Sequence, residues 1–373
     1  GMGGERSSLK PVSDHLLKAK GLSKTTKTIQ TATRSHLAQC LGASSTSQSF
    51  DLVEFLNQIL FRSVMEALIS EKVAHKEFVE TYQVFDKAMF VAFGGLPMKI
   101  FAKKSYHARS KLINWLKQDM ELSDYMKARQ EVYKSKHIAL DDVAKDTLMW
   151  VWASTSNFLP TVFWFLYFTV TNDEALGAIR SEVDEILEKR EENAENNNSC
   201  NDCFSLEELD SMVHLDSVFK ETLRVTFSGM ITREAKQDME IDLRLKKQQS
   251  KYFVKKGEQI IMYSEVLHHN PHLYPKPKDF IWNRFVIQKE DTKHNVAGLP
   301  DGETITEPFR PFGGGSHYCP GRKFAMNSAK ALVAHLVHNF DLSISGDANP
   351  DPGRDGFGAL HPDRPVQIHL KSK

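Results

Sequence analysis

The sequence predicts a mainly α-helical protein with a minor β region. Apolar residues recur at helical spacing through the first half of the chain. Short runs of alternating or clustered apolar residues begin only after residue 225, and they indicate strands. A glycine-rich loop at residues 312–321 then leads into one more helical pattern. At 373 residues the chain is long enough for one large domain or two ordinary ones, and it contains no internal repeat.

The clearest helical pattern covers residues 50–70. Its apolar residues fall on one broad stripe, which is the spacing of an amphipathic helix packed against a core. The stripe consists of Leu52, Phe55, Leu56, Leu60, Val64 and Leu68.

Further helices are expected before residue 226. Ser205 is expected to be an N-cap, with Glu208 three residues later as its capping-box partner. One helix has opposite charges three or four residues apart, which is typical of a solvent-exposed surface helix. The predicted helices cover residues 98–120, 128–136, 174–192 (the charged one), 206–212 and 215–225.

Strands are expected in the later part of the chain. The runs EIDLRL, KYFVKK and QIIMYS, at residues 240–245, 251–256 and 259–264, favour short strands. The last helix is predicted from the apolar spacing that follows the glycine-rich loop, and residues 342–373 are expected to form short strands around a turn. The apolar residues of that helix are Ala329, Leu332, Val333, Leu336, Val337 and Phe340.

The composition is that of a globular protein with a substantial core. Hydrophobic residues make up 41% of the chain and aromatic residues 10%, while 48 basic and 48 acidic residues give a formal net charge of +0. The balance lacks the basic footprint of a nucleic-acid binder, so no nucleic-acid partner is expected. Four cysteines give no disulfide framework, which indicates a reducing compartment, and residues 1–21 contain no apolar core of a secretory signal.

One long segment, between Asp146 and Asp173, contains no charged residue. By length it could span a bilayer, but a polar quartet at residues 154–157 (Ser-Thr-Ser-Asn) and Pro160 lie at its middle and would be costly in lipid. Pro160 lacks the N–H that would bond the carbonyl of Ser156, so the helix should open there. The alternatives are a membrane span, a buried structural helix, and a helix bent around a ligand.

The glycine-rich loop FGGGSHYCPG contains one cysteine, Cys319, immediately before a helix. Helix N-terminal and loop N–H groups stabilise a thiolate at such a position. The glycines let a flat ligand approach the backbone closely, and Pro320 is tolerated in the first helical turn. A buried structural cysteine is the alternative.

The spacing of this loop resembles a known signature. Phe312, Gly315, Cys319 and Gly321 form F-x-x-G-x-x-x-C-x-G, which resembles the heme-ligating motif of the cytochrome P450 superfamily. In that family the cysteine is the axial thiolate ligand of the heme iron. The resemblance therefore implies heme b as cofactor, with Cys319 as the metal ligand and Phe312, Gly315 and Gly321 beside it.

Two further motifs stand in the family's order. Glu221 and Arg224, one helical turn apart in KETLR, resemble the family's E-x-x-R motif. Arg284, in PKDFIWNRF, matches the arginine that completes a buried Glu–Arg–Arg cluster in the family. An ordinary surface pair is the alternative for Glu221 and Arg224.

The resemblance covers nearly the whole chain but only the later portion of the family's fold. Residues 1–373 are therefore expected to form a single, N-terminally truncated P450 domain, without the family's membrane anchor, first helices and first strands. Residues 85–101, 152–164 and 356–362 are similar to the branch that holds the sterol 7α- and 12α-hydroxylases and prostacyclin synthase.

The resemblance also implies roles for individual residues. Arg233 matches a position that binds a heme propionate, and His317 stands where most members have an arginine for the same task. The segment around Pro160 resembles the helix that crosses the distal face of the heme. There Ala153 and Asn157 are expected to line the oxygen site, with Asn157 at the family's threonine position.

Ser156 takes the position of the family's acid. Neither Ser156 nor Asn157 supplies a proton as a carboxylic acid does, but together they could hold an ordered water in a polar notch facing the iron. Residues 228–231 and 356–360 are expected to form part of an apolar substrate roof.

The activity implied is monooxygenation of a sterol or oxysterol, most similar to 7α-hydroxylation. By resemblance the partners are O₂, a small lipid substrate, and the NADPH–cytochrome P450 reductase at the cytosolic face of the endoplasmic reticulum membrane. The full-length protein would contact that membrane surface. Arg322, Lys323 and Lys330 could help an acidic electron donor to dock, or form a solvated charge cluster. A prostacyclin-synthase-like isomerase and a truncated, non-catalytic protein are the alternatives.

Overall fold

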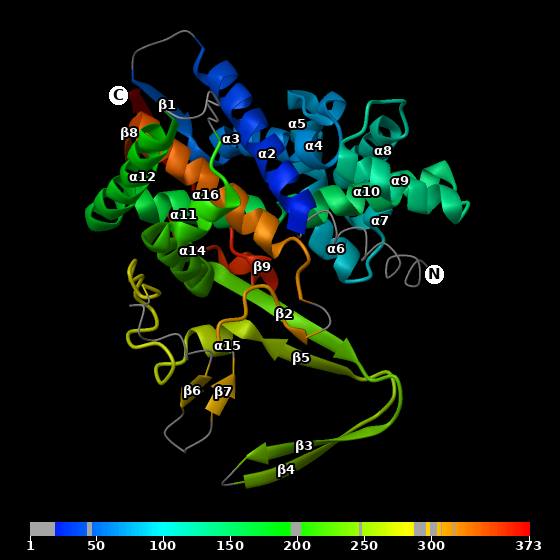
Figure 1. Ribbon diagram of the computed structural model, residues 1–373. Helices are drawn as coiled ribbons and strands as arrows, with labels where there is room; N and C mark the ends of the chain where they lie inside the picture. The colour runs from blue at the N-terminus through cyan, green and yellow to red at the C-terminus, as the bar shows by residue number, and fades with distance from the viewer. Residues whose placement is uncertain are drawn as a thin grey trace.

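The structure is a computed structural model that describes residues 19–42, 47–194, 203–245, 248–286, 296–298, 304–306, 308–315 and 318–373. A helical body occupies the upper part of the view in Figure 1, and small sheets lie below and beside it. The predicted mainly helical class with a minor β region is confirmed.

Helices form most of the body. They are α2 (Ala19–Leu41), α3 (Leu52–Leu56), α4 (Arg62–Leu68), α5 (Lys76–Asp86), α6 (Met89–Phe93), α7 (Met98–Phe101), α8 (Lys103–Leu116), α9 (Asp124–Ser135), α10 (Leu140–Thr155), α11 (Phe158–Val170), α12 (Asp173–Ala194), α13 (Leu206–Ser211), α14 (Val213–Thr226), α15 (Ser264–His268) and α16 (Arg322–Asn339).

The strands are all paired antiparallel. One sheet has the order β1-β10-β8 and a second the order β5-β2-β9, while β3-β4 and β6-β7 form two-stranded ribbons. The β3–β4 ribbon projects away from the helical body (Figure 1). The strands are β1 (Gln48–Asp51), β2 (Phe227–Glu234), β3 (Met239–Leu245), β4 (Gln248–Val254), β5 (Gln259–Tyr263), β6 (Val296–Gly298), β7 (Thr304–Thr306), β8 (Phe340–Ser345), β9 (Phe357–Ala359) and β10 (Gln367–Ser372).

The predicted helix at residues 50–70 is confirmed with two differences. Phe50 lies in strand β1, and a π-helical turn, Asn57–Phe61, joins α3 to α4. The side chain of Asp51 caps α3 by accepting a hydrogen bond from the backbone N–H of Glu54, at 2.9 Å. All six residues of the apolar stripe are buried, as their spacing predicts.

Helix α11 lies at the centre of the core. Nearly every side chain along it is buried, and it packs against α14, α12, α16 and α3. A helix that is apolar all round is a core helix when other helices surround it. Among the residues that the structure describes, none of the helices is both long and apolar enough to cross a membrane.

Two features were not expected from the pattern. Helix α2 packs against α4 and α16, although two of its buried positions, Thr26 and Thr33, are threonines that weaken the apolar signal. The predicted helix at residues 98–120 is interrupted at Ala102, whose backbone (φ −145°, ψ 57°) is not helical. The capping box of Ser205 and Glu208 is confirmed.

Candidate functional site

A cavity of about 510 Å³ lies between the break in α10–α11 and the cysteine loop. Ala153 and Asn157 line it on the helix side. Phe312, Cys319 and Gly321 line it on the loop side. The structure therefore brings together, from segments more than 150 residues apart, five of the residues that the sequence singles out.

The cysteine loop is a tight backbone turn. Gly313 and Gly315 have φ of 76° and 63°, in the left-handed region that favours glycine. The backbone N–H of Cys319 donates to the carbonyl of Phe312, at 2.9 Å, and closes the loop. A Cβ on Gly314 would lie 2.9 Å from the Arg310 guanidinium, so a side chain there would require the end of the Arg310 side chain to shift.

Cys319 is half-buried in the wall of the cavity. Burial raises the pKa of its thiol, while backbone N–H groups of Gly321 and Arg322 and the Arg322 charge lower that pKa to a smaller extent. The amides thus act in the expected direction, while desolvation opposes them more strongly. A metal cation at the sulfur would deprotonate it.

Two arginines provide positive charge near the cysteine. Arg233, on β2, and Arg310, just before the glycine-rich loop, line both this cavity and an adjoining pocket of about 560 Å³. Gly315 lines only that adjoining pocket. Arg310 was not identified from the sequence, although a cation two residues before a glycine-rich loop is a signal for an anion site. His317 lies outside the described residues.

The polar quartet is divided by the helix break. Helix α10 ends at Thr155 and α11 begins at Phe158, as Pro160 predicts. Ser154 and Asn157 line the cavity that contains Cys319, whereas Thr155 and Ser156 line a different cavity on the opposite side of the break. The expectation that Ser156 shares a notch with Asn157 is therefore wrong, because successive helical side chains point about 100° apart.

Asn157 is already engaged with strand β9. Its Oδ1 accepts a hydrogen bond from the backbone N–H of Ala359, at 3.0 Å. Gly358 has a φ of 123°, and a Cβ on it would lie 2.0 Å from that same oxygen. Trp164 adds a second tie, donating from Nε1 to the carbonyl of Leu360 at 2.8 Å. The amide nitrogen of Asn157 and the second lone pair of its oxygen are left to serve the cavity.

The expected substrate roof is only partly present at the cavity. Gly229, Met230 and Ile231 line it from β2. Ser228 is instead buried, where its hydroxyl donates to Glu265 at 2.8 Å. Residues 356–360 do not line the cavity and reach it through Asn157.

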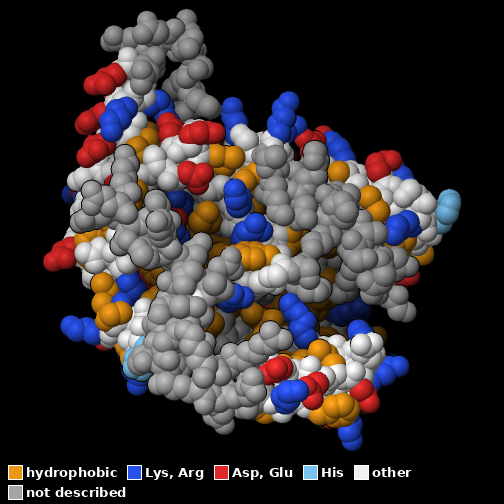
Figure 2. Space-filling model, turned by 60° about the horizontal axis from the view of Figure 1, so that its bottom comes forward, with side chains coloured by type: hydrophobic (Ala, Val, Ile, Leu, Met, Phe, Trp, Pro, Cys, Tyr) orange, Lys and Arg blue, Asp and Glu red, His pale blue; other side chains and the backbone are white. Residues whose placement is uncertain are grey.

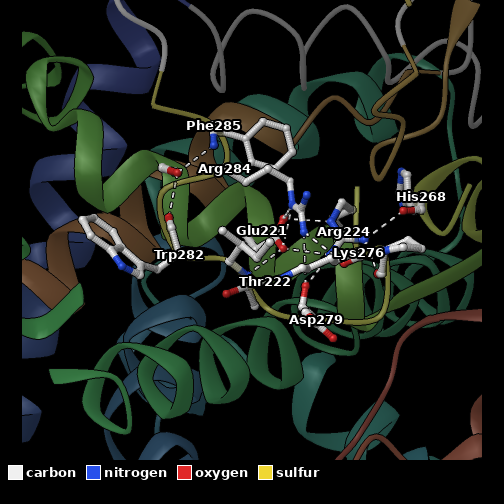
Figure 3. Close-up of polar contacts among 12 residues, drawn as sticks. Glu221, Thr222, Arg224, His268, Lys276, Asp279, Trp282, Arg284 and Phe285 are labelled. Atoms are coloured by element: carbon white, nitrogen blue, oxygen red, sulfur yellow. Dashed lines mark hydrogen bonds and ion pairs between the residues drawn. The ribbon is translucent and has the colours of Figure 1, made fainter. Parts of the chain in front are cut away.

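The predicted Glu–Arg–Arg cluster is confirmed (Figure 3). Glu221 and Arg224 are fully buried, and Nε of Arg224 donates to Glu221 at 2.8 Å. Arg284 donates from its own Nε to the same carboxylate at 2.9 and 3.0 Å. Arg224 also donates to the carbonyls of His268 and Asp279, at 2.9 and 3.0 Å. The cluster therefore fastens the segment after β5 to α14.

His268 connects this cluster to the cysteine loop. Its Nε2 accepts a hydrogen bond from the backbone N–H of Arg310, at 3.1 Å, two residues before Phe312. Burial, followed by the charges of His269 and Arg224, lowers the pKa of His268 to about 3. The ring is thus neutral at pH 7 and remains an acceptor for the loop.

The charged residues after Cys319 do not form one exposed cluster. Lys330 is buried, with Nζ 3.6 Å from a carboxylate oxygen of Asp216. Arg322 lies over the ring of Tyr318, 4.4 Å from its centroid, and only Lys323 of the three is exposed. The interpretation of Lys330 as part of a docking surface is therefore wrong. On the face shown in Figure 2, the visible Lys and Arg side chains are interspersed with Asp and Glu.

The family model described as cytochrome P450 matches residues 96–370. The chain belongs to the cytochrome P450 family. A solved structure described as retinoic acid-bound cyanobacterial CYP120A1 has a TM-score of 0.70 at 18% identity and covers 97% of this chain and 78% of that chain. The likeness shows that the chain has the P450 fold.

Three curated P450 relatives have similar sequence identities to this chain, between 28% and 31%. Cytochrome P450 7A1 of Sus scrofa is 31% identical over 305 residues, which are 79% of this chain and 59% of the relative. A 25-hydroxycholesterol 7-alpha-hydroxylase of Rattus norvegicus is 28% identical over 341 residues, 88% of this chain and 80% of the relative. Prostacyclin synthase of Rattus norvegicus is 29% identical over 257 residues, 68% and 49%. The chain thus spans about half to four fifths of their lengths.

Proposed function

We propose that this P450 chain is the heme-thiolate portion of a monooxygenase that hydroxylates a sterol or oxysterol, in the manner of the 7α-hydroxylases it is similar to. The observation that carries the proposal is the single cavity in which Cys319, on a glycine-rich loop, faces the helix break at Ala153 and Asn157. Names of two relatives, cytochrome P450 7A1 and 25-hydroxycholesterol 7-alpha-hydroxylase, support the substrate class.

The cavity fits a flat, dianionic, iron-containing cofactor such as heme b. The loop lacks side chains at Gly313 and Gly314, where the backbone forms the wall. The thiol of Cys319 is the sulfur donor that such an iron requires. Arg233 and Arg310 can pair with carboxylates of the cofactor from the adjoining pocket. When bound, heme supplies O₂ binding and electron transfer.

The protein's own groups at the oxygen side are few. Ala153 is small and leaves space above the cofactor. Asn157 can donate from its amide nitrogen, while its oxygen already accepts the N–H of Ala359. No carboxylic acid lines this part of the cavity among the described residues. We infer that protons reach the oxygen site through ordered water positioned by the Asn157 amide.

The remaining walls suit a lipid. They are mostly apolar and come from α10, α14 and β2, so an extended hydrocarbon body would be desolvated there. They include Trp150, Phe219, Leu223, Phe227, Met230 and Ile231. By the resemblance, the full-length protein would act at the cytosolic face of the endoplasmic reticulum membrane, with electrons from NADPH–cytochrome P450 reductase.

A spectrum tests the first step. The chain reconstituted with heme and reduced under CO should show the Soret band of a thiolate-ligated P450, and Cys319→Ala should lose it. Cys203→Ala is the matched control, because Cys203 is buried against Thr31 on α2. Absence of heme binding by the wild-type chain would favour the non-catalytic alternative.

A turnover assay then distinguishes the two candidate activities, sterol hydroxylation and endoperoxide isomerisation. With reductase, NADPH and O₂, we expect a 7α-hydroxylated product from cholesterol or 25-hydroxycholesterol. A prostacyclin-synthase-like isomerase is the second candidate, because no acid lines the oxygen side among the described residues and that synthase is among the relatives. NADPH-independent conversion of an endoperoxide, without sterol hydroxylation, would establish the isomerase instead.

A further inference from the structure

A second cavity lies on the opposite side of the same helix break. It has a volume of about 310 Å³ and is built by α3, α5, the α10–α11 break and the loop after β9. Neither Cys319 nor Asn157 lines it. Thr155 and Ser156, the two members of the polar quartet that turn away from the first cavity, line this one.

Two buried polar atoms in its wall are unsatisfied. Oγ of Ser156 and Nε2 of His361 are buried without a hydrogen-bond partner among the described residues. Ser156 is only 6% exposed. Because an unpaired buried polar atom is costly, such atoms facing a cavity indicate a bound polar group.

The chemistry of His361 defines what it can accept. Burial, and secondarily the Arg354 charge, lowers the pKa of His361 to about 4, against a smaller opposing effect of the Ser156 backbone, so the ring is neutral at pH 7. In the tautomer that carries its proton on Nδ1, Nε2 is a free acceptor.

The rest of the wall is compensated or apolar. Asp86 accepts from Nε1 of Trp152, at 2.9 Å, and from Arg354, at 3.2 Å, so the two charges pair with each other. Lys87 is exposed at the rim. The apolar portion is formed by Leu56, Leu159, Pro160 and Phe163.

We propose that this cavity binds a neutral amphipathic alcohol, whose hydroxyl donates to Nε2 of His361 and accepts from Oγ of Ser156 while its hydrocarbon body lies against Leu159 and Phe163. A hydroxyl satisfies both orphaned atoms at once, since it is both donor and acceptor. A carboxylate could not donate to Nε2, and an ammonium could not accept from Ser156. This site does not depend on heme or on the function proposed above.

The test compares 1-octanol with 1-methoxyheptane, an ether with the same number of carbon and oxygen atoms that cannot donate. Affinities for the full chain at pH 7 are measured by calorimetry, and the ¹⁵N resonance of His361 Nε2 is followed by NMR. We expect octanol to bind about tenfold more tightly than the ether, as one buried hydrogen bond implies, and to shift that resonance.

Variants localise the effect. His361→Phe should remove the octanol preference, because only octanol can donate to Nε2. Ser156→Ala should weaken both probes, since each accepts from its Oγ, and Leu159→Trp, which fills the cavity, should abolish binding of both. Ser328→Ala is the matched control, because Oγ of Ser328 is also buried without a described partner but lines a different pocket. Equal affinities for the two probes, an unmoved His361 resonance, or a preference unchanged in His361→Phe would each overturn the proposal.

Discussion

At the residue scale, Asn157 and Gly358 act as a pair. The Asn157 amide oxygen receives the N–H of Ala359, and that approach is possible only because position 358 has no side chain. The family resemblance places Asn157 at the oxygen site, and the structure adds that the same residue holds strand β9. A substitution at position 157 therefore alters both the cavity and the position of β9.

Gly358→Ala should destabilise the protein by about 1–3 kcal/mol. The cost arises from the Gly-only backbone region at φ 123° and from a Cβ placed 2.0 Å from Asn157 Oδ1. Urea unfolding measures it. In an Asn157→Ala background the additional cost of Gly358→Ala should be smaller, because the steric part is removed.

Gly177→Ala is the control for this pair. Gly177 lies in α12 with no atom within 4 Å of an added Cβ, so alanine there should be neutral or slightly stabilising. If Gly358→Ala is as stable as Gly177→Ala, the close approach at Asn157 is not a real constraint.

At the element scale, the Glu–Arg–Arg cluster joins α14 to the cysteine loop. Arg224 holds the carbonyl of His268, and the His268 ring receives the N–H of Arg310. A surface pair on one helix would carry no such connection. The cluster thus sets the position of Arg310, at the start of the segment that contains Cys319.

Glu221→Gln should lower the free energy of unfolding by about 3–5 kcal/mol, because it leaves the fully buried Arg224 without its counter-charge. It should also weaken heme binding through the displaced loop. Denaturant unfolding and heme titration measure the two effects.

Glu240→Gln is the matched control. Its partner, Lys251, is exposed on the β3–β4 ribbon, so the change should stay within about 0.5 kcal/mol. A similar loss in the free energy of unfolding for both variants would show that burial of the cluster does not strengthen its contribution to stability.

At the scale of the whole molecule, buried neutral histidines make stability depend on pH. The pKa values of His268 and His361 are lowered to about 3 and about 4, below the ordinary value of 6.5. Between these lowered pKa values and 6.5, the unfolded chain therefore binds more protons than the folded chain. The free energy of unfolding must decrease as the pH falls below about 6.5.

We expect each of the two histidines to contribute a loss of up to about 1.4 kcal/mol per pH unit between pH 6 and pH 4. Urea unfolding at pH 7, 6 and 5 tests this, and His268→Gln should reduce the slope. His272→Gln, at an exposed position, should leave the slope unchanged. A pH-independent stability over this range would contradict the burial of both rings.

Much of the architecture was predictable from local patterns. The apolar stripe of residues 52–68, the capping box at Ser205 and the break before Pro160 each depend on residues within a few positions of one another. The motif around Cys319 and the E-x-x-R pair also correctly indicated the family. Helix α2 was not predicted, because threonines occupy part of its buried face and hide the helical period.

The sequence by itself therefore determined the fold class, the family and the residues that meet at the first cavity, since spacing along the chain sets which side chains share a face. Only the tertiary structure decided the side on which Ser156 points, the engagement of Asn157 by Ala359, the presence of Arg310 in the wall and the raised pKa of Cys319. These features depend on desolvation and on contacts between segments more than 150 residues apart, which no local pattern records.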